Sequence, residues 1–243
     1  MRIPRIFQAS ALIEGSEHEL SDDAANHVGR VLRLREGAEL ALFSGDNQVY
    51  QATIINASKK NVRVSIGSSN LENVESPLAI HLVQGISRGE RMDFVLQKSV
   101  ELGVKSITPL FTERCTVKLQ GERLAKKQEQ WQRIVISACE QSGRNYVPEV
   151  RPALTLSEWL SQPPLGQRLM LEPTATNSFS TLKPNNAFEI LIGPEGGFSD
   201  QEVSLCHQHQ CQGVQMGPRI LRTETAALAA ITALQCQFGD LAG

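Results

Sequence analysis

The sequence predicts an α/β protein of two domains: a small β-barrel over residues 1–72, then a larger domain with a mostly parallel sheet over residues 73–243. Three observations support this prediction. The 243 residues are enough for one large domain or two modest ones. The first part contains alternating strand patterns separated by turn residues, whereas apolar strands alternate with helices after Pro77. Hydrophobic residues make up 41% and charged residues 21% of the chain, which excludes disordered and fibrous classes.

Short strands dominate the prediction for the first domain. A hairpin is predicted where one alternating run, a Ser-Gly-Asp-Asn turn and a second alternating run follow one another at residues 38–43, 44–47 and 48–54. Residues 61–66 alternate in the same way and predict another strand. Residues 22–30 form a short helical candidate. The polar, breaker-rich segment over residues 67–77 predicts the linker between the domains.

The second domain is predicted from apolar segments that alternate with helical patterns, which is typical of a parallel sheet with crossover helices. The predicted strands cover residues 78–83, 106–111, 168–171, 188–192 and 214–216. One predicted helix carries Met92, Val95, Leu96 and Ser99 on one face and ends at Gly103. The other predicted helices cover residues 122–141, a stretch from Ser199, and residues 223–238.

Charge and cysteine content exclude several functional classes. With 24 basic and 26 acidic residues the net charge is −2, so any RNA-binding face must come from local arginine clusters. No apolar run reaches the roughly 18 residues of a membrane span, and no apolar signal core follows the N-terminus. Five cysteines indicate free thiols in a reducing compartment. We therefore expect a cytoplasmic protein without membrane segments.

The most informative local motif is Ile-Gly-Pro-Glu-Gly-Gly-Phe-Ser at residues 192–199, between an apolar strand and a helix. Ser199 and Glu202 have the spacing of a capping box. Glycines at the end of a parallel strand allow a ligand to approach the backbone. The motif lacks the spacing of dinucleotide and phosphate loops. From the residues alone, a tight turn and a ligand loop are equally good interpretations.

A second Gly-Pro motif lies at residues 216–227, where a short strand again meets a helix. One interpretation is structural: Thr223 caps the helix and Glu224 suits its first turn. The other is functional: Arg222 and Glu224 face a reacting group in a pocket shared with the first motif. The small residues on one predicted helix face indicate close packing against another element; they are Ala226, Ala229, Ala230 and Ala233.

Two further groups of residues bear on binding. Arginines cluster at several points of the chain, and their bidentate geometry suits phosphate, although a solvated surface charge is the better explanation of any single one. The Cys-His-Gln-His-Gln-Cys segment at residues 206–211 resembles a metal motif, but its four side chains cannot converge from a helix. We expect no metal site.

The chain resembles the 16S rRNA (uridine-N3) methyltransferases of the SPOUT superfamily along essentially its full length. The motifs that carry this resemblance lie at residues 2–6, 26–33, 97–104, 108–115, 138–144, 191–197 and 221–226. The resemblance implies a PUA-like β-barrel at the N-terminus and a C-terminal SPOUT α/β domain with a trefoil knot. It also implies a homodimer, S-adenosylmethionine as cofactor and 16S rRNA within the small ribosomal subunit as partner.

The resemblance also assigns candidate site residues. The implied cofactor-binding residues are Leu171, Ile192, Gly193, Pro194, Glu195, Gly197, Met216, Gly217, Ile220, Leu221 and Ala226. The candidate RNA-binding residues are Arg2, Arg5, Arg30, Arg33, Arg88, Arg114 and Arg144. The candidate catalytic residues are Arg222 and Glu224.

The chemistry of the reaction gives these two residues their expected roles. Uracil N3 must lose a proton to become a nucleophile, and the negative charge then spreads onto the uracil oxygens. We expect Arg222 to stabilise that charge, and Glu224 to act as base or to orient Arg222, with Glu195 as an alternative base. Two other functions remain open: the same chemistry on another RNA such as tRNA, and a non-catalytic ribosome-assembly factor that binds RNA.

Overall fold

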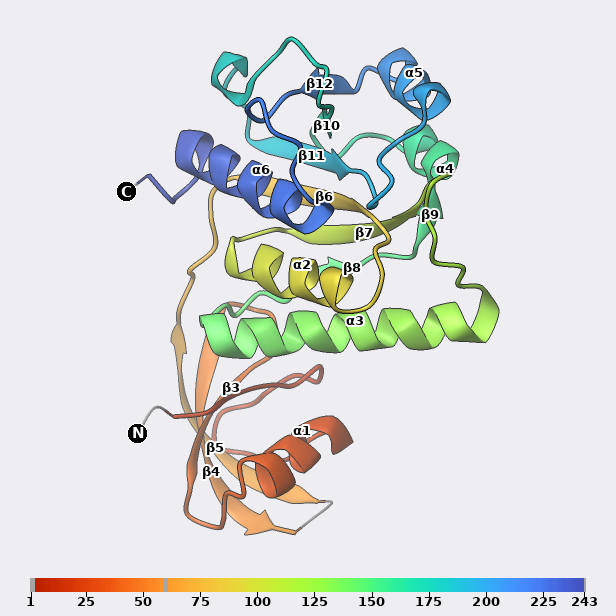
Figure 1. Ribbon diagram of the computed structural model, residues 1–243. Helices are drawn as coiled ribbons and strands as arrows, with labels where there is room; N and C mark the ends of the chain where they lie inside the picture. The colour runs from red at the N-terminus through yellow and green to blue at the C-terminus, as the bar shows by residue number, and fades with distance from the viewer. Residues whose placement is uncertain (1–2, 59–60, 243) are drawn as a thin grey trace. The chain divides into compact units, whose positions relative to one another are not determined.

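The computed structural model describes residues 3–58 and 61–242, and it divides into two compact units (Figure 1). The first unit comprises Met1–Glu75 and Cys139–Val147. The second comprises Ser76–Ala138 and Pro148–Gly243. The segment 139–147, which falls within the second predicted domain, therefore packs with the first unit.

The first unit is built on a five-stranded sheet with the order β1-β3-β4-β5-β2. Its strands are β1 Arg5–Phe7, β2 Glu17–Glu19, β3 Glu39–Phe43, β4 Gln48–Ala57 and β5 Val62–Leu71. The predicted hairpin is confirmed, because β3 and β4 pair antiparallel around a turn in which Gly45 and Asn47 have positive φ. Alternate residues of these strands face a core that includes Leu42, Ile54 and Val64.

The predicted helix over residues 22–30 forms as two pieces. An α-helix, α1, covers Asp22–Asn26, and a π-helical turn, η1, continues over His27–Val31. Gly29 lies against the end of β4, where an added Cβ would approach the carbonyl oxygen of Ser58 to 2.9 Å. The wider π-helical turn is followed by Arg33 in the left-handed region, with φ of 55°.

The predicted linker over residues 67–77 is wrong in its first half. Strand β5 continues to Leu71, and Ser69, Asn70 and Leu71 pair with the start of β4. Most of this end of the strand is exposed, so neither face requires apolar residues and the sequence reads as polar loop. Backbone pairing to β4 supplies the regular structure that composition does not reveal.

The second unit contains a parallel sheet with the order β12-β10-β11-β6-β7-β8, while β9 also pairs with β7. Its strands are β6 Ala79–Gly85, β7 Ser106–Phe111, β8 Glu149–Val150, β9 Leu154–Thr155, β10 Gln167–Leu171, β11 Ala187–Ile192 and β12 Gln212–Val214. Every pairing among these strands is parallel, which confirms the predicted α/β class. The last strand begins two residues before the predicted one.

The remaining elements are helices that connect the strands or, for the last helix, follow them. They are α2 Glu90–Glu101, α3 Gly121–Ser142, α4 Leu156–Ser161, the 3-10 turn η2 Phe179–Thr181, α5 Asp200–Gln208 and α6 Thr223–Phe238. Helices α2 and α6 lie side by side on one face of the parallel sheet (Figure 1). Within the described residues, no helix is long and apolar enough to cross a membrane.

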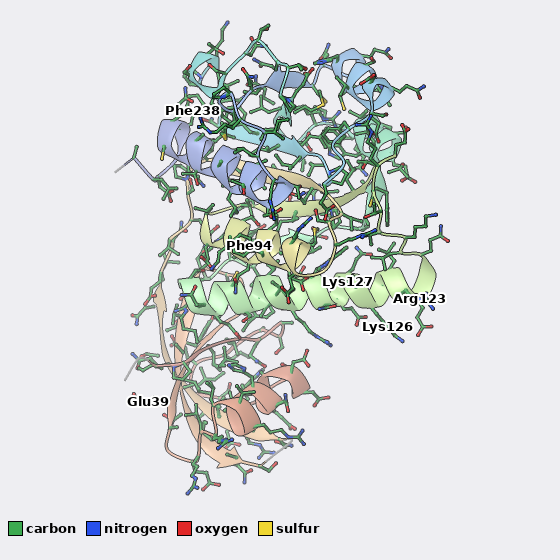
Figure 2. All side chains as sticks on the ribbon, viewed as in Figure 1. Glu39, Phe94, Arg123, Lys126, Lys127 and Phe238 are labelled. Atoms are coloured by element: carbon green, nitrogen blue, oxygen red, sulfur yellow. The ribbon has the colours of Figure 1, made fainter. Side chains whose placement is uncertain are left out.

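Helix α6 packs through a different stripe from the one predicted. The buried stripe consists of Ala227, Ala230, Ile231 and Leu234, at the spacing of one helical face. Of the four predicted alanines only Ala230 is buried, and the other three are half-buried. At the C-terminal end, Phe238 stacks on Phe188 of β11 with ring centroids 5.6 Å apart (Figure 2). The face turned toward the sheet decides burial, and residue size alone does not reveal that face.

Candidate active site

A pocket of about 910 Å³ lies where β10, β11 and β12 end. Its walls come from the segments that follow these three strands and from the start of α6. Open parallel sheets bind ligands beyond the carboxyl ends of their strands, because the backbone leaves the sheet there and loops diverge. Both Gly-Pro motifs therefore contribute to one pocket, as the functional interpretation of their sequence requires.

The segment after β11 is both a tight turn and a pocket wall. The Gly197 N–H donates to the carbonyl oxygen of Pro194 at 2.9 Å, and Gly197 has φ of 67°. An added Cβ at Gly196 would approach Cβ of Arg114 to 2.9 Å. Glycine is thus required for conformation at one position and for space at the other. The predicted capping box of α5 is confirmed, with both reciprocal bonds between Ser199 and Glu202 present.

Glu195 anchors this turn to the start of α2. Its Oε1 accepts from the backbone N–H of Arg88 at 3.0 Å and from Nη1 of Arg91 at 3.3 Å. Partial burial raises the pKa of the Glu195 carboxyl, but these hydrogen bonds and the Arg91 charge outweigh burial, so the pKa is lowered overall. The carboxylate is therefore ionised at neutral pH and weakly basic. This lowered pKa favours an anchoring role over the alternative role as base.

Thr223 does not cap α6. The N-cap is Arg222, whose side chain makes no capping bond. The Thr223 hydroxyl instead donates to the carbonyl oxygen of Gly193 at 2.6 Å. Capping was predicted from local sequence, whereas the acceptor comes from a loop thirty residues earlier. The first turn of α6 is thus attached directly to the turn after β11.

The two candidate catalytic residues both line the pocket. Arg222 is exposed, and Glu224 is half-buried in the first turn of α6. Among the described residues, Oε2 of Glu224 is a buried oxygen without a hydrogen-bond partner. A buried carboxylate oxygen without a donor is costly unless a ligand supplies one. Both side chains therefore border the space that a bound molecule would occupy.

The pocket also contains every residue that the resemblance assigned to the cofactor: Leu171, Ile192, Gly193, Pro194, Glu195, Gly197, Met216, Gly217, Ile220, Leu221 and Ala226. Sequence reasoning did not assign Arg91 or Arg219 to the pocket, which they line together with Arg114 and Arg222. For Arg91 a signal was present, since it lies one helical turn after Arg88 where a strand meets a helix. For Arg219 the signal was its position directly after Gly217 and Pro218 in the second Gly-Pro motif.

The candidate RNA-binding arginines lie in different environments. Arg30 and Arg33 are exposed on the first unit. Arg5 is half-buried, donates to Oδ1 of Asn145 and lies 5.2 Å from the ring centroid of Phe43. Arg2 lies outside the described residues. Arg144 is 4% exposed and its Nε donates to Glu75 at 2.8 Å, so burial and a carboxylate partner remove it from the candidate RNA-binding surface.

In the second unit, both candidate RNA-binding arginines are exposed but hydrogen-bonded. Nη1 of Arg114 donates to the carbonyl oxygen of Gly196 at 3.2 Å, and Nε of Arg88 donates to Oγ1 of Thr116 at 2.9 Å. Arg114 therefore holds the turn after β11 that lines the pocket, and Arg88 connects the start of α2 to the segment after β7.

The Cys-His segment at residues 206–211 is distributed over the end of α5. Cys206 and Cys211 are buried in the core, whereas His207 is exposed and its Nε2 lies 3.1 Å from Oε2 of Glu172. Across the described part of the chain, no three His, Cys, Asp or Glu side chains are grouped to hold a metal ion.

Two family models match the chain: an RNA methyltransferase domain over residues 74–235 and an RNA methyltransferase PUA domain over residues 20–67. A ribosomal RNA small subunit methyltransferase E from Buchnera aphidicola subsp. Schizaphis graminum is 40% identical over 242 residues, covering 99% of this chain and 98% of the relative.

Two solved structures are similar over nearly the whole chain. A methyltransferase from Legionella pneumophila in complex with the bound cofactor SAM has a TM-score of 0.97 and 47% identity, covering 99% of this chain and 100% of that one. A ribosomal RNA small subunit methyltransferase E from Neisseria gonorrhoeae bound to S-adenosyl methionine has a TM-score of 0.94 and 42% identity, with 98% and 99% covered.

Proposed function

This chain belongs to the RNA methyltransferase family, and on that premise we propose that it methylates N3 of one uridine near the 3′ end of 16S rRNA in the small ribosomal subunit, using S-adenosylmethionine. The observation that carries the proposal is the single pocket at the ends of three parallel strands, which contains the implied cofactor residues together with Arg222 and Glu224. The proposed substrate implies a cytoplasmic location.

The residues around the pocket fit S-adenosylmethionine. The volume of about 910 Å³ is within the usual range for a ligand of this size. The turn after β11 presents backbone groups without side chains at its glycines, and Ile192, Met216 and Leu221 supply apolar surface. The unpartnered Oε2 of Glu224 suits a ligand that carries positive charge. When bound, S-adenosylmethionine supplies an electrophilic methyl group.

Arg222 and Glu224 would act on the acceptor base. Arg222 is exposed at the pocket, so its guanidinium is available to stabilise negative charge on the uracil oxygens. Glu224 would accept the N3 proton or orient Arg222. Glu195 is a weaker candidate base, because its carboxylate already accepts from Arg88 and Arg91 and its pKa is lowered. The target base would leave its stack to enter the pocket.

We assign the RNA contacts outside the pocket to the first unit. Its five-stranded sheet supports a PUA-like barrel, and the exposed Arg30 and Arg33 supply the positive charge. In the second unit we propose a trefoil knot formed by the segments that follow β11 and β12. We further propose a homodimer, because Ala229 and Ala233 on α6 are half-buried small residues that allow a second copy to approach closely.

Nucleoside mass spectrometry tests the proposed substrate. A strain lacking this chain should lose one 3-methyluridine from 16S rRNA and regain it when the wild-type chain is expressed. Loss of a methylated uridine from tRNA instead would support the same chemistry on tRNA. Unchanged nucleosides in both RNAs, together with a defect in subunit assembly, would support a non-catalytic assembly factor and contradict the proposal.

A further inference from the structure

Thr223 lies at the centre of a buried hydrogen-bond network beneath the pocket. Its Oγ1 donates to the carbonyl oxygen of Gly193 at 2.6 Å. The same oxygen accepts from Nε2 of Gln84 at 2.9 Å, and that nitrogen also donates to the carbonyl oxygen of Gly85 at 3.0 Å. Thr223 is 6% exposed and Gln84 is fully buried, so water does not compete for these bonds.

The direction of each hydrogen bond follows from the chemistry of the groups. The amide nitrogen of Gln84 can only donate, and the carbonyl oxygen of Gly193 can only accept. The single hydroxyl proton of Thr223 must therefore point at Gly193. Gln84 fixes this orientation because its amide nitrogen is itself held by the carbonyl of Gly85.

The network connects three segments of the second unit. Gln84 is the last but one residue of β6 and lies beside Ile192 of β11 in the strand register. An added Cβ at Gly85 would lie 2.5 Å from the backbone nitrogen of Pro194, so the end of β6 and the turn after β11 are in direct backbone contact. Thr223 adds the third segment, because it opens α6 between the candidate catalytic residues Arg222 and Glu224.

We propose that Thr223 is a positioning residue for methyl transfer. Its hydroxyl holds the turn over residues 193–197, which would contact the cofactor, against the first turn of α6, which carries Arg222 and Glu224. Gln84 keeps the hydroxyl in the required orientation. The inference rests on the proposed function, since it needs S-adenosylmethionine in this pocket.

Isothermal titration with S-adenosylmethionine, in the absence of RNA, tests the role of the hydroxyl. Thr223→Val keeps the shape of the side chain but removes the donor to Gly193, and it should raise the Kd by about tenfold to a hundredfold. Thr223→Ser keeps the hydroxyl and should stay within about threefold of wild type. Thr232→Val, on the same helix but outside the pocket lining, is the matched control and should bind normally.

Hydrogen exchange of the ligand-free protein distinguishes positioning from general stability. In Thr223→Val, exchange should increase in the turn over residues 193–197 and in the first turn of α6, but not along β10 or α2. Uniformly faster exchange across the second unit would show a purely structural role and contradict the inference.

The single variant Gln84→Met keeps the proposal testable if Thr223→Val does not fold. Gln84→Met alone should raise the Kd by about threefold to tenfold. The Thr223 hydroxyl can still donate to Gly193, but Gln84 no longer holds the hydroxyl in that orientation. Where both variants fold, their effects should be less than additive, because they act on one network. Normal binding by Thr223→Val would overturn the inference, and so would normal binding by Gln84→Met where Thr223→Val does not fold. Wild-type protein that binds no S-adenosylmethionine would instead overturn the proposed function.

Discussion

The turn over residues 27–35 in the first unit and the surroundings of the pocket in the second unit both present exposed arginines. Only in the second unit are some of these arginine side chains bonded to other parts of the fold. Within the described residues, the side chains of Arg30 and Arg33 make no hydrogen bond or ion pair. Arg88, Arg91 and Arg114 are all bonded to other loops of the second unit.

This difference determines what the removal of each arginine should change: RNA affinity alone, or RNA affinity together with the structure of the pocket. Arginines without partners contribute long-range charge, so their removal should change RNA affinity and its salt dependence while the fold stays intact. Arginines bonded to pocket loops also fix the shape of the pocket. Their removal should therefore change RNA binding and the order of these loops at the same time.

Arg144 is a buried arginine whose contribution we expect to be to stability and not to RNA binding. Its side chain is 5% exposed and is paired with the 9% exposed Glu75. Arg144→Ala should lower the free energy of unfolding by about 3–5 kcal/mol, because Glu75 is left charged and buried. Arg63→Ala is the control: its pair with Glu17 is exposed, and its loss should cost at most about 1 kcal/mol. Equal losses in urea denaturation would contradict the assignment of Arg144 to the interior.

Arg222, in contrast to the buried Arg144, is exposed and lines the pocket. Arg222→Ala should lower the single-turnover rate of methyl transfer by about 10²–10³, as expected when a donor to a developing anion is removed. Cofactor affinity should change little, because a cationic sulfonium gains nothing from a nearby arginine. Arg222→Lys should rescue poorly, since it lacks the planar fork. A normal rate, or a defect confined to cofactor affinity, would remove Arg222 from the catalytic residues.

Glu224→Gln separates two roles for the neighbouring carboxylate. If Glu224 is the base, the single-turnover rate should fall and the residual rate should rise with pH, because N3 then ionises without help. If Glu224 only orients Arg222, the loss should be smaller and the pH profile should match wild type. A wild-type rate at every pH would exclude both roles.

The turn in the first unit should show a purely electrostatic effect. The pair Arg30→Glu and Arg33→Glu should weaken RNA binding by about tenfold or more at low salt and reduce the salt slope by about 1.5–2. Kd for S-adenosylmethionine should not change. Arg63→Glu reverses a charge elsewhere on the same unit and serves as control. An unchanged salt slope would show that this turn does not contact phosphates.

The smallest effect at neutral pH concerns His81, the third residue of β6 in the parallel sheet. Burial, with the charges of Arg151 and Lys105, lowers the pKa of His81 to about 4. Between pH 4 and 6.5 the unfolded chain therefore binds one more proton than the folded chain, so stability should rise with pH by up to about 1.4 kcal/mol per unit. His81→Gln should flatten this slope and leave stability near pH 8 almost unchanged. An unaltered slope would assign the pH dependence to other groups.

Local patterns were sufficient for much of this fold. Alternation predicted the hairpin around residues 44–47, and the Ser199–Glu202 spacing predicted a capping box that forms. The Gly-Pro motifs could be located at strand ends, and parallel topology then brings strand ends together.

The failures share one physical cause, which is a partner distant in sequence. Thr223 was predicted to cap its own helix, but its acceptor is thirty residues away. Arg144 looks like a surface cation until Glu75, sixty-nine residues earlier, is placed beside it. The strand over residues 67–71 is polar because it is exposed, and only pairing with β4 reveals it.

The central claim is that the pocket of the second unit supports methyl transfer to N3 of a uridine in 16S rRNA. The most direct test incubates the purified protein and S-adenosylmethionine with small ribosomal subunits from a strain lacking this chain, then maps the modified nucleoside by mass spectrometry. The account predicts one 3-methyluridine per subunit, near the 3′ end, and almost none with Arg222→Ala. No incorporation by wild-type protein, or a methyl group on ribose or on tRNA instead, would contradict it.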